Sequence, residues 1–156
     1  MGKTRRELRD NVFKLLFRVQ FFSPEDMEEQ INVFLHGGSG GDAGHEFDED
    51  PFGDFFAEED AEYIRNKCES VIAKIPEIDK SINDNTTGWD TQRMGNAELT
   101  ILRLAVYEMV YDDDIPVGVA INEAVELAKS YGSSDSGGFV NAVLSNVKNA
   151  LIPDKE

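Results

Sequence analysis

Cysteine and long apolar runs are scarce in this chain of 156 residues. Its single cysteine, Cys68, has no partner for an internal disulfide. No apolar run approaches the roughly 18 residues that a membrane-spanning helix requires. The basic N-terminus lacks the apolar stretch and small-residue cleavage site of a secretory signal. These absences predict a cytoplasmic protein that makes no membrane contact.

Basic residues are also scarce, and they are unevenly placed. The chain has 15 Lys and Arg against 31 Asp and Glu, a formal net charge of −16, which at first sight argues against a polyanionic ligand. No Lys or Arg occurs from Val19 to Ile64, whereas six precede residue 20, namely Lys3, Arg5, Arg6, Arg9, Lys14 and Arg18. Such segregation is typical of a nucleic-acid arm, although a merely solvated basic helix end has the same composition.

The usual signatures of catalysis and metal binding are missing. There is no Gly-x-Ser-x-Gly motif, no Cys/His pairing signature and no phosphate-binding glycine loop after a strand. Cys68 falls on the apolar face of a helical pattern, which favours a small buried hydrophobe over a nucleophile. A partial calcium-loop match from Asp48 to Glu59 has Phe52 at a ligand position, so we interpret it as a chance match. We expect no enzyme activity, no metal and no cofactor.

Apolar residues recur at helical spacing along most of the chain. Thr4 and Glu7 have the spacing of a capping box, and Ser23-Pro24 predicts the start of a second helix. Pro76 is predicted to break the third helix. The helical patterns after residue 60 run from Ala61 to Ile75, from Ile78 to Ile82, from Ala97 to Tyr111, from Val117 to Tyr131 and from Phe139 to Val147. No alternating run of strand type occurs, so the sequence predicts an all-α fold of about seven helices.

Two interruptions suggest the domain organisation. Residues of about 37–60 form a glycine-rich and then acidic segment, which we interpret as a surface insertion. We expect a single domain, 1–156, whose helical halves span about 1–83 and 97–150. Trp89 and Met94 are candidate buried residues of the linker between the halves. Gly132 is predicted to end the helix before it as a C′ glycine.

The first helix has a chemical peculiarity. Arg5 and Arg6 stand in its first turn, where the helix dipole favours anions over cations. A bound phosphate would make these cations favourable at the helix start, because the dipole, the unpaired amides and the guanidinium groups would all attract the phosphate. Phe13 and Phe17 would stack on unpaired bases in one interpretation and pack on a neighbouring helix in the other, and the sequence leaves both open. Arg9 is a candidate phosphate contact in either case.

Several blocks resemble the NusB family of antitermination proteins. Arg5-Arg6, Leu8-Arg9 and Leu15-Leu16-Phe17 resemble the arginine-rich first helix of that family, and residues 98–109 resemble its central helix. The motif AINEAVELAKSYG at 120–132 and the motif DS with FVNAVL at 135–144 are highly specific at this spacing. Ala142 stands where the family usually has glycine, and residues 37–60 have no counterpart.

The resemblance implies an all-helical fold of two three-helix halves joined by a helix. It further implies a transcription antitermination factor that binds boxA RNA of ribosomal RNA leaders together with NusE, a small-subunit ribosomal protein. The pair would join RNA polymerase and other Nus factors and promote processive transcription. A loop with Lys129, Tyr131 and Asp135 would contact RNA, and Glu98 would contact the partner. The complete set of predicted RNA-binding residues is Lys3, Arg5, Arg6, Arg9, Phe13, Lys14, Lys129, Tyr131 and Asp135.

Other functions stay open at this point. The alternative is an acidic helical protein-interaction module that does not bind RNA. An enzyme fragment is a third hypothesis, because a similar domain is fused to RNA cytosine methyltransferases, but we expect no room here for a cofactor-binding domain. The acidic body predicts moderate RNA affinity for the protein alone and stronger binding with a basic partner. Whether the protein forms a homodimer is left open.

Overall fold

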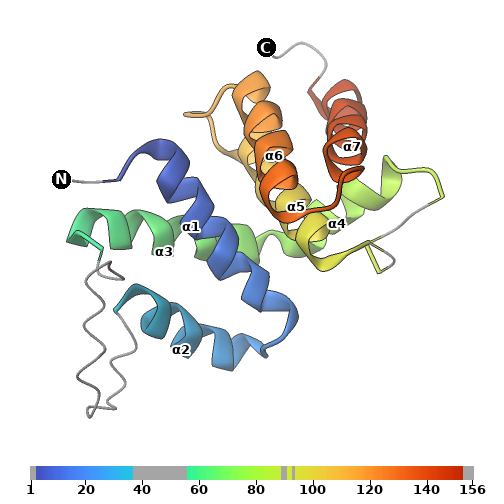
Figure 1. Cartoon of the computed structure of the whole chain (residues 1–156). Coiled ribbons are helices and arrows are strands. Elements are labelled where there is room, and N and C mark those ends of the chain that lie inside the picture. Colours follow the sequence, from blue (N-terminus) through green and yellow to red (C-terminus); the bar gives the residue numbers. More distant parts are fainter. Residues whose placement is uncertain (1–2, 37–55, 89–90, 93, 153–156) are drawn as a thin grey trace. The chain divides into compact units, whose positions relative to one another are not determined.

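The computed structural model describes residues 3–36, 56–88, 91–92 and 94–152, and the helices in these ranges are shown in Figure 1. Within them the chain forms helices and no strand, which confirms the all-α prediction. The helices are α1 (Arg5–Phe17), the 3-10 helix η1 (Arg18–Gln20), α2 (Pro24–Leu35), α3 (Glu58–Ala73), α4 (Ile75–Asp84), α5 (Asn96–Tyr111), α6 (Val117–Tyr131) and α7 (Ser136–Leu151). None of these described helices is both long and apolar enough to cross a membrane.

The chain divides into two compact units, Met1–Ile72 and Ala73–Glu156. The boundary differs from the halves expected at about 1–83 and 97–150, because α4 contacts α5 and α7 in the second unit. The proposed insertion lies largely outside the described residues, as does Trp89. Met94, the other candidate of the linker, is buried.

Side-chain caps start the first two helices of unit 1. The Thr4 hydroxyl accepts a hydrogen bond from the Glu7 N–H at 3.1 Å, and the Thr4 N–H donates to the Glu7 carboxylate at 2.9 Å. The hydroxyl of Ser23 accepts from the Asp26 N–H at 3.2 Å, and Pro24 follows in the first turn of α2. Each cap satisfies an amide that has no partner within its helix. Both predicted helix starts are confirmed.

In unit 1, α3 is hydrogen-bonded both to α2 and to the chain just before α1. Arg65 of α3 donates to the Asn32 side chain of α2 at 2.6 Å. The main-chain N–H of Lys3 donates to the Asp60 carboxylate of α3 at 2.9 Å. The buried apolar residues of this unit are Val12, Phe13, Leu15, Leu16, Met27, Ile31, Leu35, Ile64, Cys68 and Val71.

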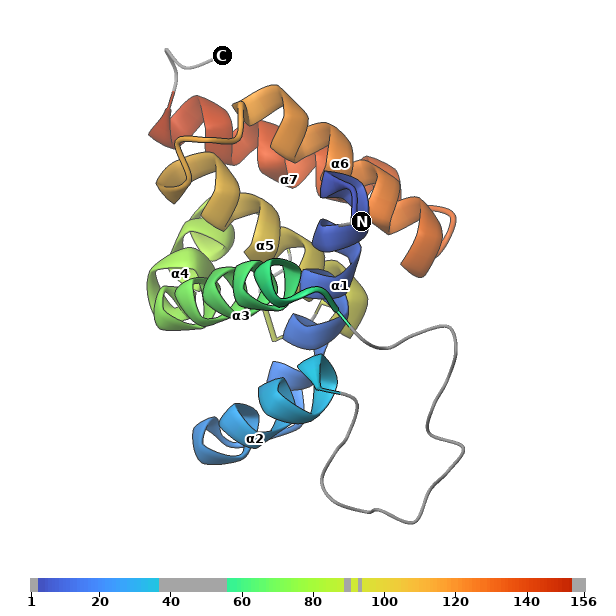
Figure 2. The same cartoon turned by 90° about the vertical axis from the view of Figure 1, so that its left-hand side faces the viewer.

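In unit 2, α5 is the central helix. It contacts α4, α6 and α7, while α6 and α7 also pack on each other (Figure 2). Buried residues surround most of α5: Leu99, Thr100, Ile101, Leu102, Leu104, Ala105, Val106, Glu108 and Met109. Three neighbouring helices cover those faces, and a helix covered on several sides buries residues beyond a single stripe.

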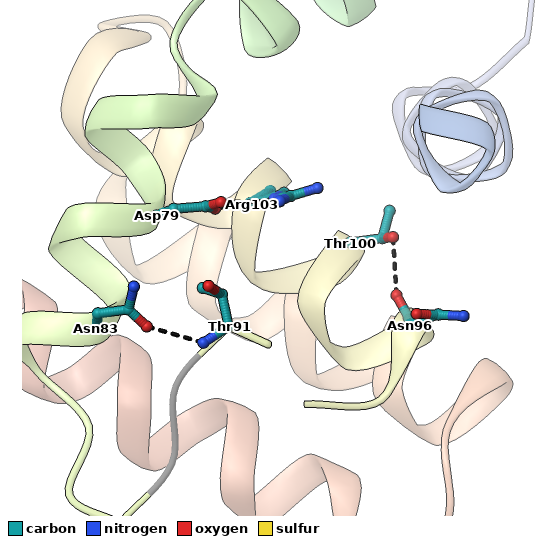
Figure 3. Close-up of polar contacts among 6 residues, drawn as sticks. All are labelled: Asp79, Asn83, Thr91, Asn96, Thr100 and Arg103. Carbon is teal, nitrogen blue, oxygen red and sulfur yellow. Dashed lines mark hydrogen bonds and ion pairs between the residues drawn. The ribbon is translucent and has the colours of Figure 1, made fainter. Parts of the chain in front are cut away.

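Polar contacts attach α4 to α5 and to the segment that follows α4 (Figure 3). Arg103 of α5 donates to the Asp79 carboxylate of α4 through two nitrogens, at 2.9 and 2.8 Å. The Asn83 side chain accepts from the Thr91 N–H at 2.8 Å. The helix α3 ends at Ala73, and Pro76 lies in the first turn of α4, so the predicted break near Pro76 is confirmed.

Gly132 ends α6 for a reason that the sequence did not reveal. Its φ of −105° and ψ of −164° are extended rather than left-handed, so any residue could adopt this backbone. A Cβ at Gly132 would lie 2.6 Å from the Ser136 Cβ and 3.0 Å from the Ala128 carbonyl oxygen. The glycine is therefore required by the close approach of the first turn of α7.

Candidate nucleic-acid interface

The candidate RNA-binding residues form two groups, one in each unit. The first group is at the start of α1, where Arg5 and Arg6 are exposed. Lys14 is also exposed, and its ammonium lies 3.2 Å from the Asp10 carboxylate one turn earlier. The Thr4 and Glu7 cap fixes where the helix begins. Arg5 and Arg6 therefore project from a defined first turn, which suits them to contact an anion.

Lys3 and Arg18 of this segment contact other side chains of the chain. The Lys3 ammonium lies 5.4 Å from the centre of the Phe56 ring. Arg18 donates to the Gln30 side chain at 2.8 Å, and its guanidinium lies 5.2 Å from the centre of the Phe34 ring. Lys3 is half-buried, so part of its side chain stays accessible.

Burial changes the interpretation of Arg9 and Phe13. Phe13 is 3% exposed, so its ring face is not accessible to a base, and the core-packing alternative holds at this position. Arg9 is 8% exposed and takes part in an interaction within the chain, so its guanidinium is poorly placed for a phosphate. The sequence could not distinguish these two from exposed residues of the same type, because their neighbours come from elsewhere in the chain.

An aromatic row continues from Phe13 toward the surface. The rings of Phe13 and Phe17 have centres 6.1 Å apart, and those of Phe17 and Phe21 have centres 5.5 Å apart. Phe17 is half-buried and Phe21 is 57% exposed. Phe17 therefore packs against its aromatic neighbours and still has part of its surface accessible.

One member of the second group, Asp135, lines a pocket in unit 2. The pocket has a volume of about 400 Å³ and is lined by Met94, Gly95, Glu98, Ser133, Asp135, Ser136 and Phe139. The pocket combines the N-terminus of α5, the loop between α6 and α7, and the first turn of α7. It thus contains the predicted partner contact Glu98 and one of the predicted RNA contacts, Asp135.

Hydrogen bonds of Ser136 connect the parts of this pocket. The Ser136 hydroxyl donates to the Glu98 carboxylate, accepts from the Ser133 N–H at 2.8 Å and lies 3.2 Å from the Ser133 hydroxyl. Ser136 itself is 3% exposed. In the sequence, Ser136 is part of the DS motif and Phe139 begins the last helical pattern. Their shared pocket depends on α5, which is distant in sequence.

The remaining predicted residues lie at the end of α6. Lys129 and Tyr131 are exposed, and the Lys129 ammonium lies 3.5 Å from the Glu126 carboxylate. Asp135 precedes α7 at its N-cap position, but its side chain makes no capping hydrogen bond there. Lys129, Tyr131 and Asp135 are therefore accessible to a ligand in solution.

The described residues offer little for other chemistry. Burial, with a smaller effect from Glu69, raises the pKa of the Cys68 thiol to about 12. Such a thiol stays protonated at neutral pH, and the thiolate is the nucleophilic form. Among the described residues, no three His, Cys, Asp or Glu side chains are grouped closely enough to hold a metal ion.

Comparison with known proteins agrees with the sequence motifs. The NusB family profile matches residues 6–149. The chain is 44% identical over 144 residues to the transcription antitermination protein NusB of Agathobacter rectalis, an alignment that covers 91% of this chain and 97% of that protein. These relatives are transcription factors and not enzymes.

Solved structures share the fold. The Thermotoga maritima NusB structure superposes with a TM-score of 0.74 at 31% identity, covering 94% of this chain and 92% of that one. A chain from the crystal structure of the antitermination factors NusB and NusE with double-stranded RNA has a TM-score of 0.68 at 25% identity, covering 94% and 96%. By its motifs, its fold and these relatives, the chain belongs to the NusB family of transcription antitermination proteins.

Proposed function

We propose that this protein binds boxA RNA of ribosomal RNA leaders together with NusE, and that the complex keeps RNA polymerase transcribing processively. The observation that carries the RNA part is the exposure of Arg5 and Arg6 on the capped first turn of α1. A solved structure with a similar fold contains NusB, NusE and double-stranded RNA together, which supports both proposed partners. RNA polymerase and other Nus factors enter the proposal through the resemblance alone.

The N-terminal contacts would be made by exposed cations. Arg5 and Arg6 would hold RNA phosphates, with Lys3 and Lys14 adding charge nearby. Guanidinium groups suit phosphate oxygens because they donate two parallel hydrogen bonds. Arg9 would support this surface from within the chain and would not contact the phosphate itself, because it is 8% exposed.

The second unit would contribute contacts of a different kind. Lys129 would contact a phosphate and Tyr131 would stack on an unpaired base, as aromatic side chains do with single-stranded RNA. Asp135 would repel phosphate, but its carboxylate can accept hydrogen bonds from base amino groups. Glu98 is half-buried and would accept hydrogen bonds from basic residues of the protein partner.

The acidic body favours a basic protein partner. With a formal charge of −16, the chain repels RNA outside its small basic surface. A basic ribosomal protein would neutralise part of that field and add phosphate contacts of its own. The alternative function, a protein-interaction module without RNA binding, would use the same acidic surface but would leave Arg5 and Arg6 without a ligand.

Charge reversal at the first turn tests the RNA-binding proposal. The Arg5→Glu/Arg6→Glu variant should lose boxA binding by at least about tenfold, because two phosphate contacts become repulsive. Binding is measured by fluorescence anisotropy of a labelled boxA oligonucleotide, and folding by helical circular dichroism. Arg9 is left unchanged, since a carboxylate at that buried position would disturb the fold.

A matched control has the same change in net charge. The Lys80→Glu/Lys148→Glu variant reverses two cations on α4 and α7 and should bind boxA RNA within about twofold of the unmodified protein. An equal loss of RNA affinity in both variants would mean that net charge alone explains the effect. Full binding by a folded Arg5→Glu/Arg6→Glu variant would exclude the first turn of α1 as the RNA site.

A further inference from the structure

We propose that Ser136 is a positioning residue that holds the Glu98 carboxylate and the Ser133–Asp135 turn in a single arrangement. Through these it would support partner binding and RNA binding alike without contacting either ligand. The inference rests on the proposed function, because it assigns Glu98 to the protein partner and Asp135 to RNA. It gives a role to the serine of the DS motif at 135–136, whose burial alone would not single it out as functional.

Ser136 has the burial and the bonding of such a residue. It is 3% exposed, so it presents little surface for a direct contact with a ligand. That hydroxyl has one proton, which it donates to the Glu98 carboxylate, and it accepts the Ser133 N–H at 2.8 Å. A single oxygen atom thereby connects the first turn of α5 to the loop between α6 and α7. Alanine at this position would remove both bonds while keeping the helix.

Two glycines make room for this arrangement. A Cβ at Gly95 would collide with the Glu98 carboxylate, which folds back over the start of α5. A Cβ at Gly132 would lie 2.6 Å from the Ser136 Cβ. Neither glycine has a positive φ, so backbone conformation does not require them. Their absent side chains instead permit the close approach of Glu98 and Ser136 to the backbone.

Helix electrostatics favours the carboxylate where Ser136 holds it. Glu98 is the third residue of α5, and Ser136 is the first residue of α7. Both helix N-termini present partial positive charge, which stabilises an anion nearby. The carboxylate is therefore oriented before a partner arrives. A ligand gains affinity when the groups that bind it are already ordered.

Loss of the Ser136 hydroxyl should weaken both interactions. In Ser136→Ala, the Glu98 side chain and the 133–135 turn would each have to be ordered when the ligand binds. We expect affinity to fall about three- to tenfold for NusE and also for boxA RNA, which corresponds to one or two side chains ordered on binding. Glu98→Gln should weaken NusE binding alone, and Lys129→Ala should weaken RNA binding alone. Ser136→Ala should thus weaken both interactions, whereas a change at a direct contact should weaken only one. This difference distinguishes a positioning residue from a direct contact.

The experiment measures NusE and RNA affinity separately for the full chain. Isothermal titration calorimetry gives the NusE affinity, and anisotropy gives the boxA affinity. Ser145→Ala, which removes another α7 hydroxyl, is the matched control and should bind both ligands normally. In a double-mutant cycle for NusE, Ser136→Ala and Glu98→Ala should be non-additive, because the first acts through the second. Additive losses would overturn the proposal.

Amide hydrogen exchange provides a readout that global stability does not determine. In Ser136→Ala the Ser133 amide loses its acceptor, so it should exchange faster while the amides in the middle of α5 keep their protection. Gly132→Ala, which displaces Ser136 by a different route, should reproduce the double loss of binding. A uniform rise in exchange across unit 2 would show general loosening and would overturn a positioning role.

The failure of this inference can be separated from failure of the proposed function. If the unmodified chain binds neither boxA RNA nor NusE, the proposed function fails and the inference fails with it. If the unmodified chain binds both, and a folded Ser136→Ala variant binds both with unchanged affinity, only the positioning role of Ser136 is refuted.

Discussion

Cys68 shows how burial decides the chemistry of a single residue. The side chain is fully buried in α3, and the pKa of its thiol is raised to about 12 from 9.0. Burial disfavours the charged thiolate, so the folded protein keeps a proton that the unfolded chain loses at lower pH. The stability that this contributes is complete below about pH 9 and is lost as the pH rises toward 12.

The pH dependence of stability tests this assignment. Above about pH 9 the free energy of unfolding should fall by up to about 1.4 kcal/mol per pH unit because of Cys68 alone. In Cys68→Ala this contribution is absent, so its stability should approach that of the unmodified protein between about pH 9 and pH 10. Urea unfolding at each pH measures the difference. A constant difference across that range would contradict a thiol held protonated by burial.

The basic residues of α1 have different roles despite their similar chemistry. Arg9→Ala should lower the free energy of unfolding by about 1 to 2 kcal/mol, because it removes a buried side chain together with its interaction inside the chain. Arg5→Ala, at an exposed position of the same helix, should change stability by less than about 0.5 kcal/mol. Thermal or urea denaturation compares them. Equal effects would mean that Arg9 is as exposed in solution as Arg5.

At the scale of the helix, the cap of α1 links stability to the proposed RNA contact. Thr4→Ala removes the hydroxyl that accepts from the Glu7 N–H, and it should cost about 1 kcal/mol. Fraying of the first turn should also weaken boxA binding, because Arg5 and Arg6 belong to that turn. Thr4→Ser keeps the hydroxyl and is the control, with both properties near normal. Urea unfolding measures stability, and fluorescence anisotropy measures RNA affinity. If Thr4→Ala is less stable but binds RNA with unchanged affinity, the cap does not support the RNA site.

Helix starts were predictable from sequence because their causes are local. Thr4 with Glu7 and Ser23 with Pro24 lie within one turn of the amides that they satisfy or replace. The role of Gly132 was not predictable, since it depends on how closely α7 begins beside the end of α6. Glu98 was assigned to the partner by resemblance, but its bond to Ser136 joins residues 38 apart. Contacts across such separations need the folded chain.

At the scale of the whole molecule, helical spacing was enough to predict the all-α class and the seven α-helices of the described residues. It was insufficient for the division into units, because the sequence does not show that α4 packs on α5 and α7. The candidate site was predicted in outline only. Charge indicated the N-terminal arginines and resemblance indicated the loop near Asp135, but neither revealed the burial of Arg9 and Phe13 or the pocket beside Phe139.

The uneven charge of the whole chain has a consequence for binding. A small cationic surface on a chain of net charge −16 neutralises few phosphates, so the protein alone should bind RNA moderately and with a modest salt dependence. A basic partner would add phosphate contacts and steepen that dependence. Salt dependence therefore reports how many cations the RNA meets in each complex.

The most direct test of the central claim is the boxA affinity measured with and without NusE, from about 50 to 200 mM salt. We expect NusE to strengthen RNA binding at least about tenfold at the lower salt concentration and to steepen the decline of affinity with salt. A boxA oligonucleotide with a scrambled sequence should gain less. RNA affinity and salt dependence that stay the same when NusE is added would contradict cooperative recognition of RNA by the two proteins.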